Sequence, residues 1–167
     1  MQLDHNSIVA YFKNLNEQAA FFPDDSFFRM DLEEIMEAFR SGINFPAMAV
    51  ESPDIDLSDS SDSDTVNKRI FAFHIYKKPE TDSYDDIQAA INECEAIGYK
   101  IIARMRRDRH DPNAIIYNAF KTDSVKANQV SKVFAEMLYG YRFTGEFSKS
   151  DPLQLNADDW SDLDSRC

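Results

Sequence analysis

The sequence predicts an α+β fold, in which a mainly antiparallel β-sheet of about four strands packs against one long helix, with N-terminal helices. Residues 69–77, R-I-F-A-F-H-I-Y-K, form the strongest strand pattern in the chain, and a helical pattern follows over residues 82–109. Both faces of this strand are apolar, which is typical of a central strand with other elements on each side. Two further strand patterns, at residues 125–133 and 142–148, contribute to the predicted sheet.

Near the N-terminus, apolar residues three and four positions apart predict a helix over residues 4–22. Asp4 or Asn6 can cap this helix, because a short polar side chain accepts hydrogen bonds from the first free amides. Pro23 ends it, since proline cannot continue a helix interior. A short strand is predicted next, at residues 27–30.

A second helix is predicted over residues 31–42, where Asp31 and Glu34 have the spacing of a capping box. Gly42 can take the left-handed conformation that ends a helix. Residues 45–51 then read as another strand. These elements complete the N-terminal part of the predicted domain.

The stretch D-L-S-D-S-S-D-S-D at residues 56–64 has almost no apolar content, so we expect a flexible acidic insertion over residues 56–65. Clustered carboxylates suggest a Ca²⁺ site, but an EF-hand loop also needs a regular spacing, a glycine and a bidentate glutamate, which are missing here. We therefore predict a solvated hairpin tip without a metal. The aspartates considered as ligands are Asp56, Asp59, Asp62 and Asp64.

The apolar stripe of the long helix contains Gly98. Glycine either weakens the helix there, by about 1 kcal/mol relative to alanine, or lets the helix approach the sheet closely. In the last predicted strand, Phe143 and Phe147 share one face, and Gly145 between them suggests a bulge. We predict one domain over residues 1–150, followed by a loose acidic tail over residues 151–167.

Composition restricts the classes of partner. The 167 residues carry a formal net charge of −12, and 43% of them are hydrophobic. This content suffices for a core, whereas the acidic balance argues against general binding of nucleic acid or anionic membranes. The two cysteines, Cys94 and Cys167, do not make a disulfide framework, so free thiols are expected. No signal-peptide pattern or membrane-length apolar run occurs, which predicts cytoplasmic synthesis.

No pattern in the sequence indicates catalysis. The motifs of nucleophile elbows, zinc proteases and phosphate-binding loops do not occur. His5, His74 and His110 lack metal-ligand spacing, and His74 on a strand face fits a buried polar residue better than a catalytic base. We therefore expect no enzyme activity, no cofactor, no metal and no small-molecule substrate.

One basic cluster stands out in this acidic chain: Arg104, Arg106, Arg107 and Arg109, at the end of the long helix. Cations at that position stabilise the helix dipole. Alternatively, they contact a phosphate group or an acidic partner surface, although four arginines do not make a DNA-binding domain. Trp160 in the acidic tail is the other candidate contact residue, because aromatic side chains are enriched at interfaces.

Several segments carry a family resemblance: D-L-E-E-I-M-E-A-F-R-S-G-I-N-F-P-A-M at residues 31–48, the strand at residues 69–77 with its following helix, and Y-G-Y-R-F-T-G-E-F-S-K-S-D-P-L at residues 139–153. In these hydrophobic and turn patterns the chain resembles the small tail-completion or tail-terminator (neck) proteins of tailed phages and prophages. The resemblance covers about residues 1–160. The Asp/Ser stretch has no counterpart in it.

The resemblance implies a non-catalytic α+β subunit that forms rings at the head–tail junction or tail end. Its partners would be copies of itself and other virion proteins, without a membrane or a specific nucleic-acid sequence. It would reside in the bacterial cytoplasm during assembly and then in the phage particle. A function of another class is an acidic stand-alone binding or regulatory module, for instance a nucleic-acid mimic, which the net charge and small size favour.

Overall fold

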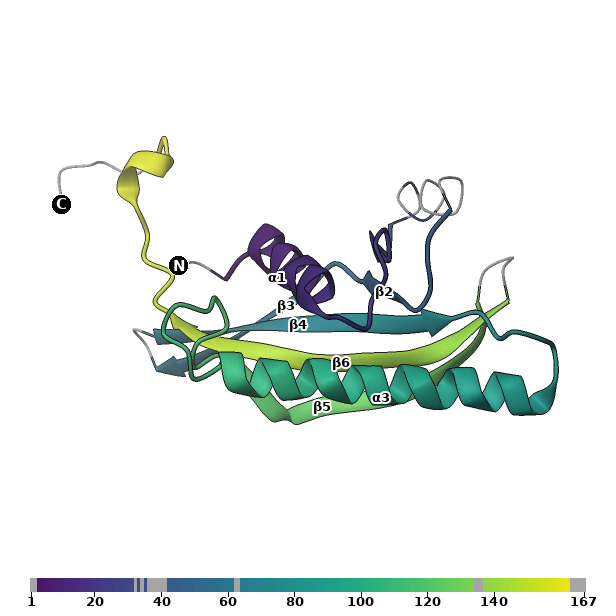
Figure 1. Ribbon diagram of the computed structural model, residues 1–167. Helices are drawn as coiled ribbons and strands as arrows, with labels where there is room; N and C mark the ends of the chain where they lie inside the picture. The colour runs from purple at the N-terminus through teal and green to yellow at the C-terminus, as the bar shows by residue number, and fades with distance from the viewer. Residues whose placement is uncertain are drawn as a thin grey trace.

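The computed structural model of the protein describes residues 3–31, 33, 35, 42–61, 64–133 and 137–162. These residues confirm the α+β class, with α-helices on one face of a sheet (Figure 1). The helices are α1 (His5–Gln18) and α3 (Tyr84–Asp108), with a short 3-10 helix, η1 (Ala157–Asp159). The strands are β1 (Phe27–Arg29), β2 (Ala47–Val50), β3 (Asp54–Ser61), β4 (Asp64–Lys77), β5 (Phe120–Val133) and β6 (Leu138–Asp151).

The sheet differs from the prediction in the number of its strands: the described residues form six and not about four. The order is β1-β2-β4-β6-β5, and β3 pairs with β4 beside β2. β1 runs parallel to β2, whereas the other four strand pairs are antiparallel. β4 is central, as predicted from its apolar faces, and it pairs with β6 through thirteen residue pairs, from Thr65–Asp151 to Lys77–Tyr139.

The Asp/Ser stretch is the clearest correction to the sequence analysis. We expected a loop over residues 56–65, but Asp54–Ser61 form β3 and pair with Asp64–Ile70 of β4. The physical reason is the length of β4: β2 pairs only with its last part, which leaves the amides and carbonyls of its first half open to a neighbour. Backbone pairing therefore orders residues that have little apolar surface to bury.

The first helix begins where its capping residue predicts, but it ends at Gln18 and not at residue 22. Asp4 is the N-cap: its side chain accepts a hydrogen bond from Ser7 N over 2.8 Å, and Ser7 Oγ accepts one from Asp4 N over 3.0 Å. The helix ends at Gln18, before Pro23. Its apolar side, which includes the fully buried Phe12, faces the sheet.

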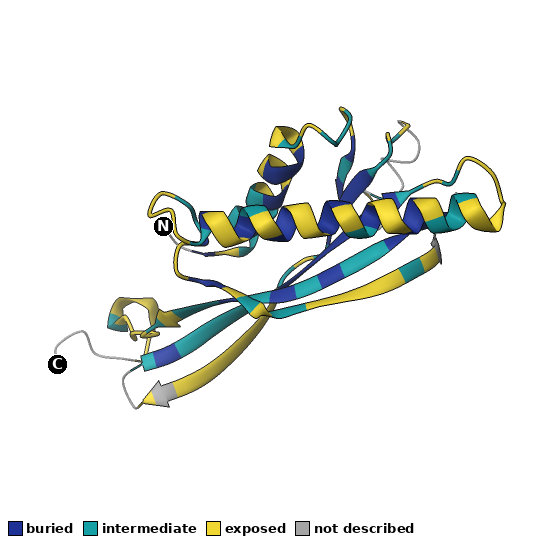
Figure 2. Ribbon diagram, turned by 60° about the horizontal axis from the view of Figure 1, so that its bottom comes forward, coloured by how far each residue is buried: buried dark blue, intermediate teal, exposed yellow. Residues whose placement is uncertain are grey.

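Both helices cover the sheet face that carries Phe71 and Phe73. The ring of Phe12 lies 5.4 Å from each of these two rings, and the stripe of α3 packs beside it in the same core. Figure 2 shows buried and exposed residues alternating along the whole length of α3, as expected for a helix with one side on the sheet. The buried stripe of α3 contains Ile91, Cys94, Ile97, Ile101 and Met105.

Gly98 lies directly over a side chain of β6. A Cβ atom at Gly98 would come within 2.0 Å of Cζ of Phe143, so glycine is what permits the close approach of α3 to the sheet. Gly145, in contrast, is not a bulge: it pairs in register with Phe71 of β4. The irregularity lies opposite, in β5, between Lys121 and Lys126.

A smaller core lies on the other sheet face, which α1 and α3 do not cover. It contains Phe28, Ala47, Ala49, Tyr76 and Leu138. This face also carries a polar cluster around His74, because residues of β4 alternate between the two faces. Both faces of β4 are therefore buried near its end, as predicted.

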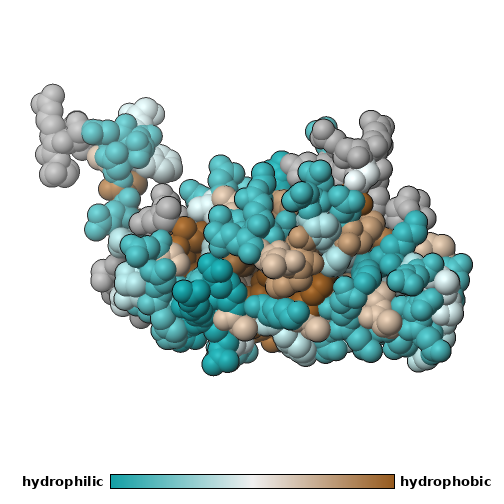
Figure 3. Space-filling view, viewed as in Figure 1, coloured by the Kyte–Doolittle hydropathy of each residue, from teal (hydrophilic) through white to brown (hydrophobic). Residues whose placement is uncertain are grey.

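Several expectations fall outside the described residues. They are the helix over residues 31–42, apart from Asp31, Glu33, Ile35 and Gly42, together with Asp62, Cys167 and the rest of the tail from residue 163. Among the residues described, none of the helices has the length and apolar character needed to cross a membrane. Hydrophilic side chains cover most of the face seen in Figure 3, with hydrophobic ones reaching the surface near its centre.

Candidate functional site

The four arginines at the end of α3 do not act as one group. Arg104 points back to its own helix and to α1: its Nε donates to Asp108 over 2.8 Å and its Nη2 to Gln18 over 3.2 Å. The same carboxylate accepts a hydrogen bond from Tyr11 of α1 over 2.9 Å. Arg104 therefore helps to fix α1 against α3, as an i,i+4 ion pair with Asp108. This pairing leaves it poorly placed for an external partner.

The other three arginines line a surface cavity of about 620 Å³ between the end of α3 and the beginning of β5. None of the three has an ion pair or side-chain hydrogen bond within the described part of the chain. We call this cavity the Arg pocket; besides Ala103 it is lined by Arg106, Arg107, Arg109, His110, Thr122 and Asp123.

The floor of the Arg pocket contains an unsatisfied polar atom. Oγ1 of Thr122 is buried and has no hydrogen-bond partner among the described residues. Buried hydroxyl groups are nearly always paired, so this unpaired atom is unusual. One carboxylate, Asp123, reduces the positive charge of the pocket without cancelling it.

Trp160 lies apart from the arginines. It follows η1 in a segment that leaves the end of β6 and stands away from the body of the molecule (Figure 1). We call residues 152–162 the C-terminal arm. Trp160 is 55% exposed, and within the described structure it makes no ring contact or ion pair with the Arg pocket. The structure thus does not join the two predicted contact regions within one chain.

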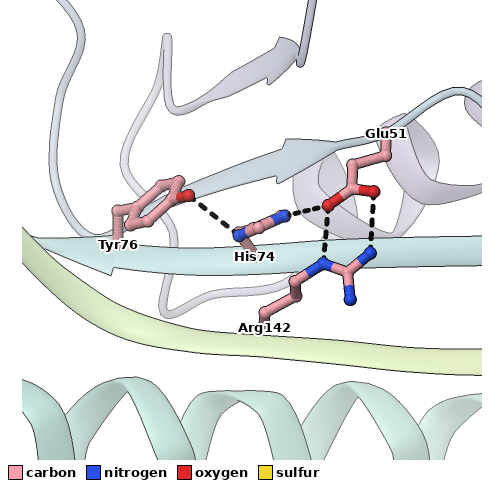
Figure 4. Close-up of polar contacts among 4 residues, drawn as sticks. All are labelled: Glu51, His74, Tyr76 and Arg142. Carbon is pink, nitrogen blue, oxygen red and sulfur yellow. Dashed lines mark hydrogen bonds and ion pairs between the residues drawn. The ribbon is translucent and has the colours of Figure 1, made fainter. Parts of the chain in front are cut away.

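A polar cluster that the sequence analysis did not assemble lies on the face opposite the helices (Figure 4). Glu51 follows β2, His74 and Tyr76 belong to β4, and Arg142 belongs to β6. The register places them together, because His74 pairs directly with Arg142 and the Glu51 amide donates to the carbonyl of Ala72 over 3.0 Å. Three neighbouring strand segments thus contribute one side chain or more to the cluster.

Its hydrogen bonds form a continuous chain. The Nε2 atom of His74 lies 2.6 Å from Oε1 of Glu51, and the hydroxyl of Tyr76 lies 2.8 Å from Nδ1 of the same ring. A carboxylate can only accept, so Nε2 carries the proton towards Glu51; in the neutral ring, Nδ1 then accepts from Tyr76. Arg142 donates to both oxygens of Glu51, over 2.6 and 2.8 Å.

The electrostatics follow from these contacts. The hydrogen bond from Arg142 is the main cause that lowers the pKa of Glu51, to about 2. Burial lowers the pKa of His74 below its ordinary value of 6.5, although the hydrogen bond to Glu51 opposes this shift. Burial also raises the pKa of Tyr76. The cluster is therefore a neutral histidine and tyrosine joined to a charged Glu–Arg pair.

Tyr76, His74 and Glu51 are arranged like a catalytic triad, in which a nucleophilic hydroxyl contacts an imidazole base and a carboxylate orients that base. These residues are too buried for a substrate to reach the hydroxyl, since Tyr76 is 1% exposed and His74 is 5% exposed. The cluster instead links the strand segments through side chains. The prediction that His74 is a buried polar residue is confirmed.

The described residues also contain no group of three or more His, Cys, Asp or Glu side chains that could hold a metal ion. The aspartates of the β3–β4 hairpin are instead engaged in local contacts. Asp59 accepts a hydrogen bond from Thr65 over 2.9 Å, and Asp56 lies 3.9 Å from Lys68.

Glu51 was missed as a site residue because its link to His74 depends on a strand register that a single sequence does not reveal.

Comparison with known proteins adds no family assignment: no family model matches the chain, and no curated protein matches it. Function must therefore be inferred from the residues and their geometry.

Proposed function

We propose that this protein is a non-catalytic assembly subunit of a tailed phage or prophage particle, which forms a ring with its own copies at the head–tail junction or tail end. The observation that carries the proposal is a group of exposed apolar side chains at one end of the sheet. Exposed apolar side chains near one another are typical of a protein–protein contact.

This end is built from the β3–β4 hairpin and the C-terminal arm. Pairing of Thr65 with Asp151 places the start of the arm beside the hairpin. On the hairpin, Ile55 is 56% exposed and Leu57 is 49% exposed. On the arm, Leu153 and Leu155 are 53% and 66% exposed. Large apolar side chains are thus exposed on the hairpin and on the segment that leaves the sheet beside it.

Polar groups in the same region also lack partners. A cavity of about 250 Å³ is lined by residues of β4, by the end of β6 and by Leu3. Oδ1 of Asn67 and Nε of Arg69 are buried there without hydrogen bonds to described residues. Unpaired buried groups cost about 1–3 kcal/mol each, so a partner that reaches them would gain stability on binding.

The edge of the sheet formed by β5 is poorly suited to pairing with a strand of another chain. Within the described chain, β5 pairs only with β6, which leaves its other side open. Apart from Ala127, its exposed residues are polar or charged, including Lys126, Asn128 and Gln129. Such residues protect an edge strand against aggregation. The hairpin end is therefore the better candidate for a specific contact between subunits.

Mass photometry and negative-stain electron microscopy of the full chain test the proposal. We expect discrete rings of one size, and loss of those rings when Ile55 and Leu57 are both replaced by Asp. The matched control is Tyr84→Asp, which changes an exposed aromatic residue at the start of α3 and should leave the rings intact. A chain that remains monomeric at every concentration, alone and with neck proteins, would contradict ring formation.

The acidic binding module remains a second candidate because of the exposed edge of β3. Asp54, Asp56 and Asp59 are all exposed along this strand. Exposed carboxylates on an ordered edge strand can bind a basic protein surface, as a nucleic-acid mimic does. A stable monomer that binds a nuclease or repressor, and loses binding when these aspartates become asparagines, would favour this function over ring assembly.

A further inference from the structure

We propose that the C-terminal arm of one copy docks in the Arg pocket of a neighbouring copy, through Asp158, Asp159 and Trp160. The inference rests on the proposed ring assembly and names its contact. It joins the two regions that the structure leaves separate within one chain. The chemistry of the pocket, the chemistry of the arm and the geometry of closed rings each support it.

The pocket is suited to an acidic ligand. Three guanidinium groups surround it in a chain whose net charge is −12, so a local excess of positive charge here is unusual. Guanidinium groups bind carboxylates through paired hydrogen bonds and stack on aromatic rings. A ligand with carboxylates next to an aromatic ring would use all of these groups.

The arm presents that combination in an ordered turn. Asn156 caps η1, where its side chain accepts from the amide of Asp158 over 3.2 Å. The turn brings Asp158 and Asp159 directly before Trp160, and all three side chains are exposed. Tryptophan is the best aromatic partner for an arginine cation. The arm thus carries two carboxylates and an indole for the three arginines of the pocket.

The arm and the pocket are different surfaces of the same chain, so the contact between copies is head-to-tail. Contacts of this kind close into rings when the rotation between subunits allows it. The two surfaces also belong to different elements: the arm follows β6, whereas the pocket lies between α3 and β5. One copy can therefore use both surfaces simultaneously, as each member of a ring must.

The first experiment measures the contact directly. A fluorescent peptide with residues 151–162 is titrated onto the full chain that carries Asp158→Ala, Asp159→Ala and Trp160→Ala, so that the chain's own arm does not compete with the peptide in either form of the pocket. We expect saturable binding that weakens as salt screens the charges. Adding Arg106→Glu and Arg107→Glu should weaken binding about tenfold or more. Equal binding to both variants would overturn the proposal.

The second experiment uses two full-chain variants that each lose one half of the contact. Arg106→Glu/Arg107→Glu retains the arm, and Asp158→Lys/Asp159→Lys/Trp160→Ala retains the pocket. Each alone should form no rings, and an equimolar mixture should give a one-to-one heterodimer, because only one contact can form. Circular dichroism of each variant confirms folding. A mixture that remains monomeric would overturn docking between copies and indicate that the arm acts within its own chain.

A charge-swapped chain, with Arg106→Glu, Arg107→Glu, Asp158→Lys and Asp159→Lys together, provides the rescue. It should form rings again, because the pair of charges is restored with opposite sign. If all variants form rings like the unmodified chain, the arm contact is wrong while ring assembly stands. If the unmodified chain forms no ring, ring assembly fails, and the peptide titration alone then decides whether the arm binds the pocket.

Discussion

Arg142 binds both oxygens of the Glu51 carboxylate: its Nε donates to Oε1 over 2.6 Å and its Nη2 to Oε2 over 2.8 Å. Glu51 follows β2 and Arg142 lies in β6, with β4 between them. The ion pair therefore spans the central strand of the sheet, and it is about one-third exposed on each side chain. A bidentate pair of this kind is geometrically specific and contributes more than a single surface contact.

Replacement of Glu51 by Ala should lower the free energy of unfolding by about 1–2 kcal/mol, because Arg142 and His74 both lose their acceptor. Urea unfolding followed by circular dichroism measures this change. The matched control is Glu17→Ala, which removes a widely exposed i,i+4 pair with Lys13. Equal losses in the two variants would show that the Glu51–Arg142 pair has no special role.

The stability of the protein should decrease as the pH falls through the ordinary pKa of histidine. Burial lowers the pKa of His74 below 6.5, so the unfolded chain binds this proton more readily than the folded chain. The stabilising effect of neutral His74 is thus present above pH 6.5 and is lost below it. Unfolding free energies at about pH 7.5 and about pH 5.5 measure the slope, which should be smaller in His74→Gln.

A second loss of stability is expected in stronger acid. The pKa of Glu51 is lowered from 4.5 to about 2, mainly by Arg142, so its contribution is present above pH 4.5 and disappears as the pH falls towards about 2. In Glu51→Gln this part of the acid unfolding curve should flatten. An unchanged curve would assign the acid transition to other carboxyl groups.

Gly98→Ala should destabilise the fold although alanine favours helices. The added Cβ would lie 2.0 Å from a ring carbon of Phe143, and that ring is fully buried and cannot leave. Overpacking costs about 1–3 kcal/mol, which exceeds the gain of about 1 kcal/mol in helix propensity. Asn92→Ala, at an exposed site of the same helix, is the control. Phe143→Leu in the Gly98→Ala background should recover part of the loss in urea unfolding.

Cys94 should remain unreactive while the protein is folded. The thiol is buried, and burial raises its pKa to about 12, so almost no thiolate is present at neutral pH. In a Cys167→Ser background, alkylation with iodoacetamide should proceed only as fast as the chain opens, and urea should accelerate it strongly. Rapid stoichiometric labelling of the native chain would show that Cys94 is accessible.

Much of the architecture can be predicted from local patterns in the sequence. The cap of α1 at Asp4, the extent of α3 and the central position of β4 depend on residues close together in the chain, which periodicity and capping rules describe well. The two interpretations of Gly98 could not be separated in this way. Only the position of Phe143, on a strand far along the chain, shows that glycine serves close packing.

What the sequence could not supply are the features that depend on strand register. The part of β3 from Asp56 onwards is predicted to be a loop because its composition is polar, and no local rule shows that β4 offers it an unpaired edge. The Glu51–His74–Arg142 contacts arise from the same kind of long-range pairing. The arginine cluster was found by composition, but its division between an internal pair at Arg104 and an open pocket required the positions of Asp108 and Thr122.

The thirteen-pair ladder between β4 and β6 has a consequence for how the chain folds. Its partners are separated in sequence by α3 and β5, so a long loop must close before the ladder forms, and closure of this kind slows folding. α3 can form earlier, since its contacts are local. During synthesis, Phe71 and Phe73 emerge from the ribosome well before the strand that will cover their flank. A nascent chain at that stage exposes an aromatic surface to which a chaperone can bind.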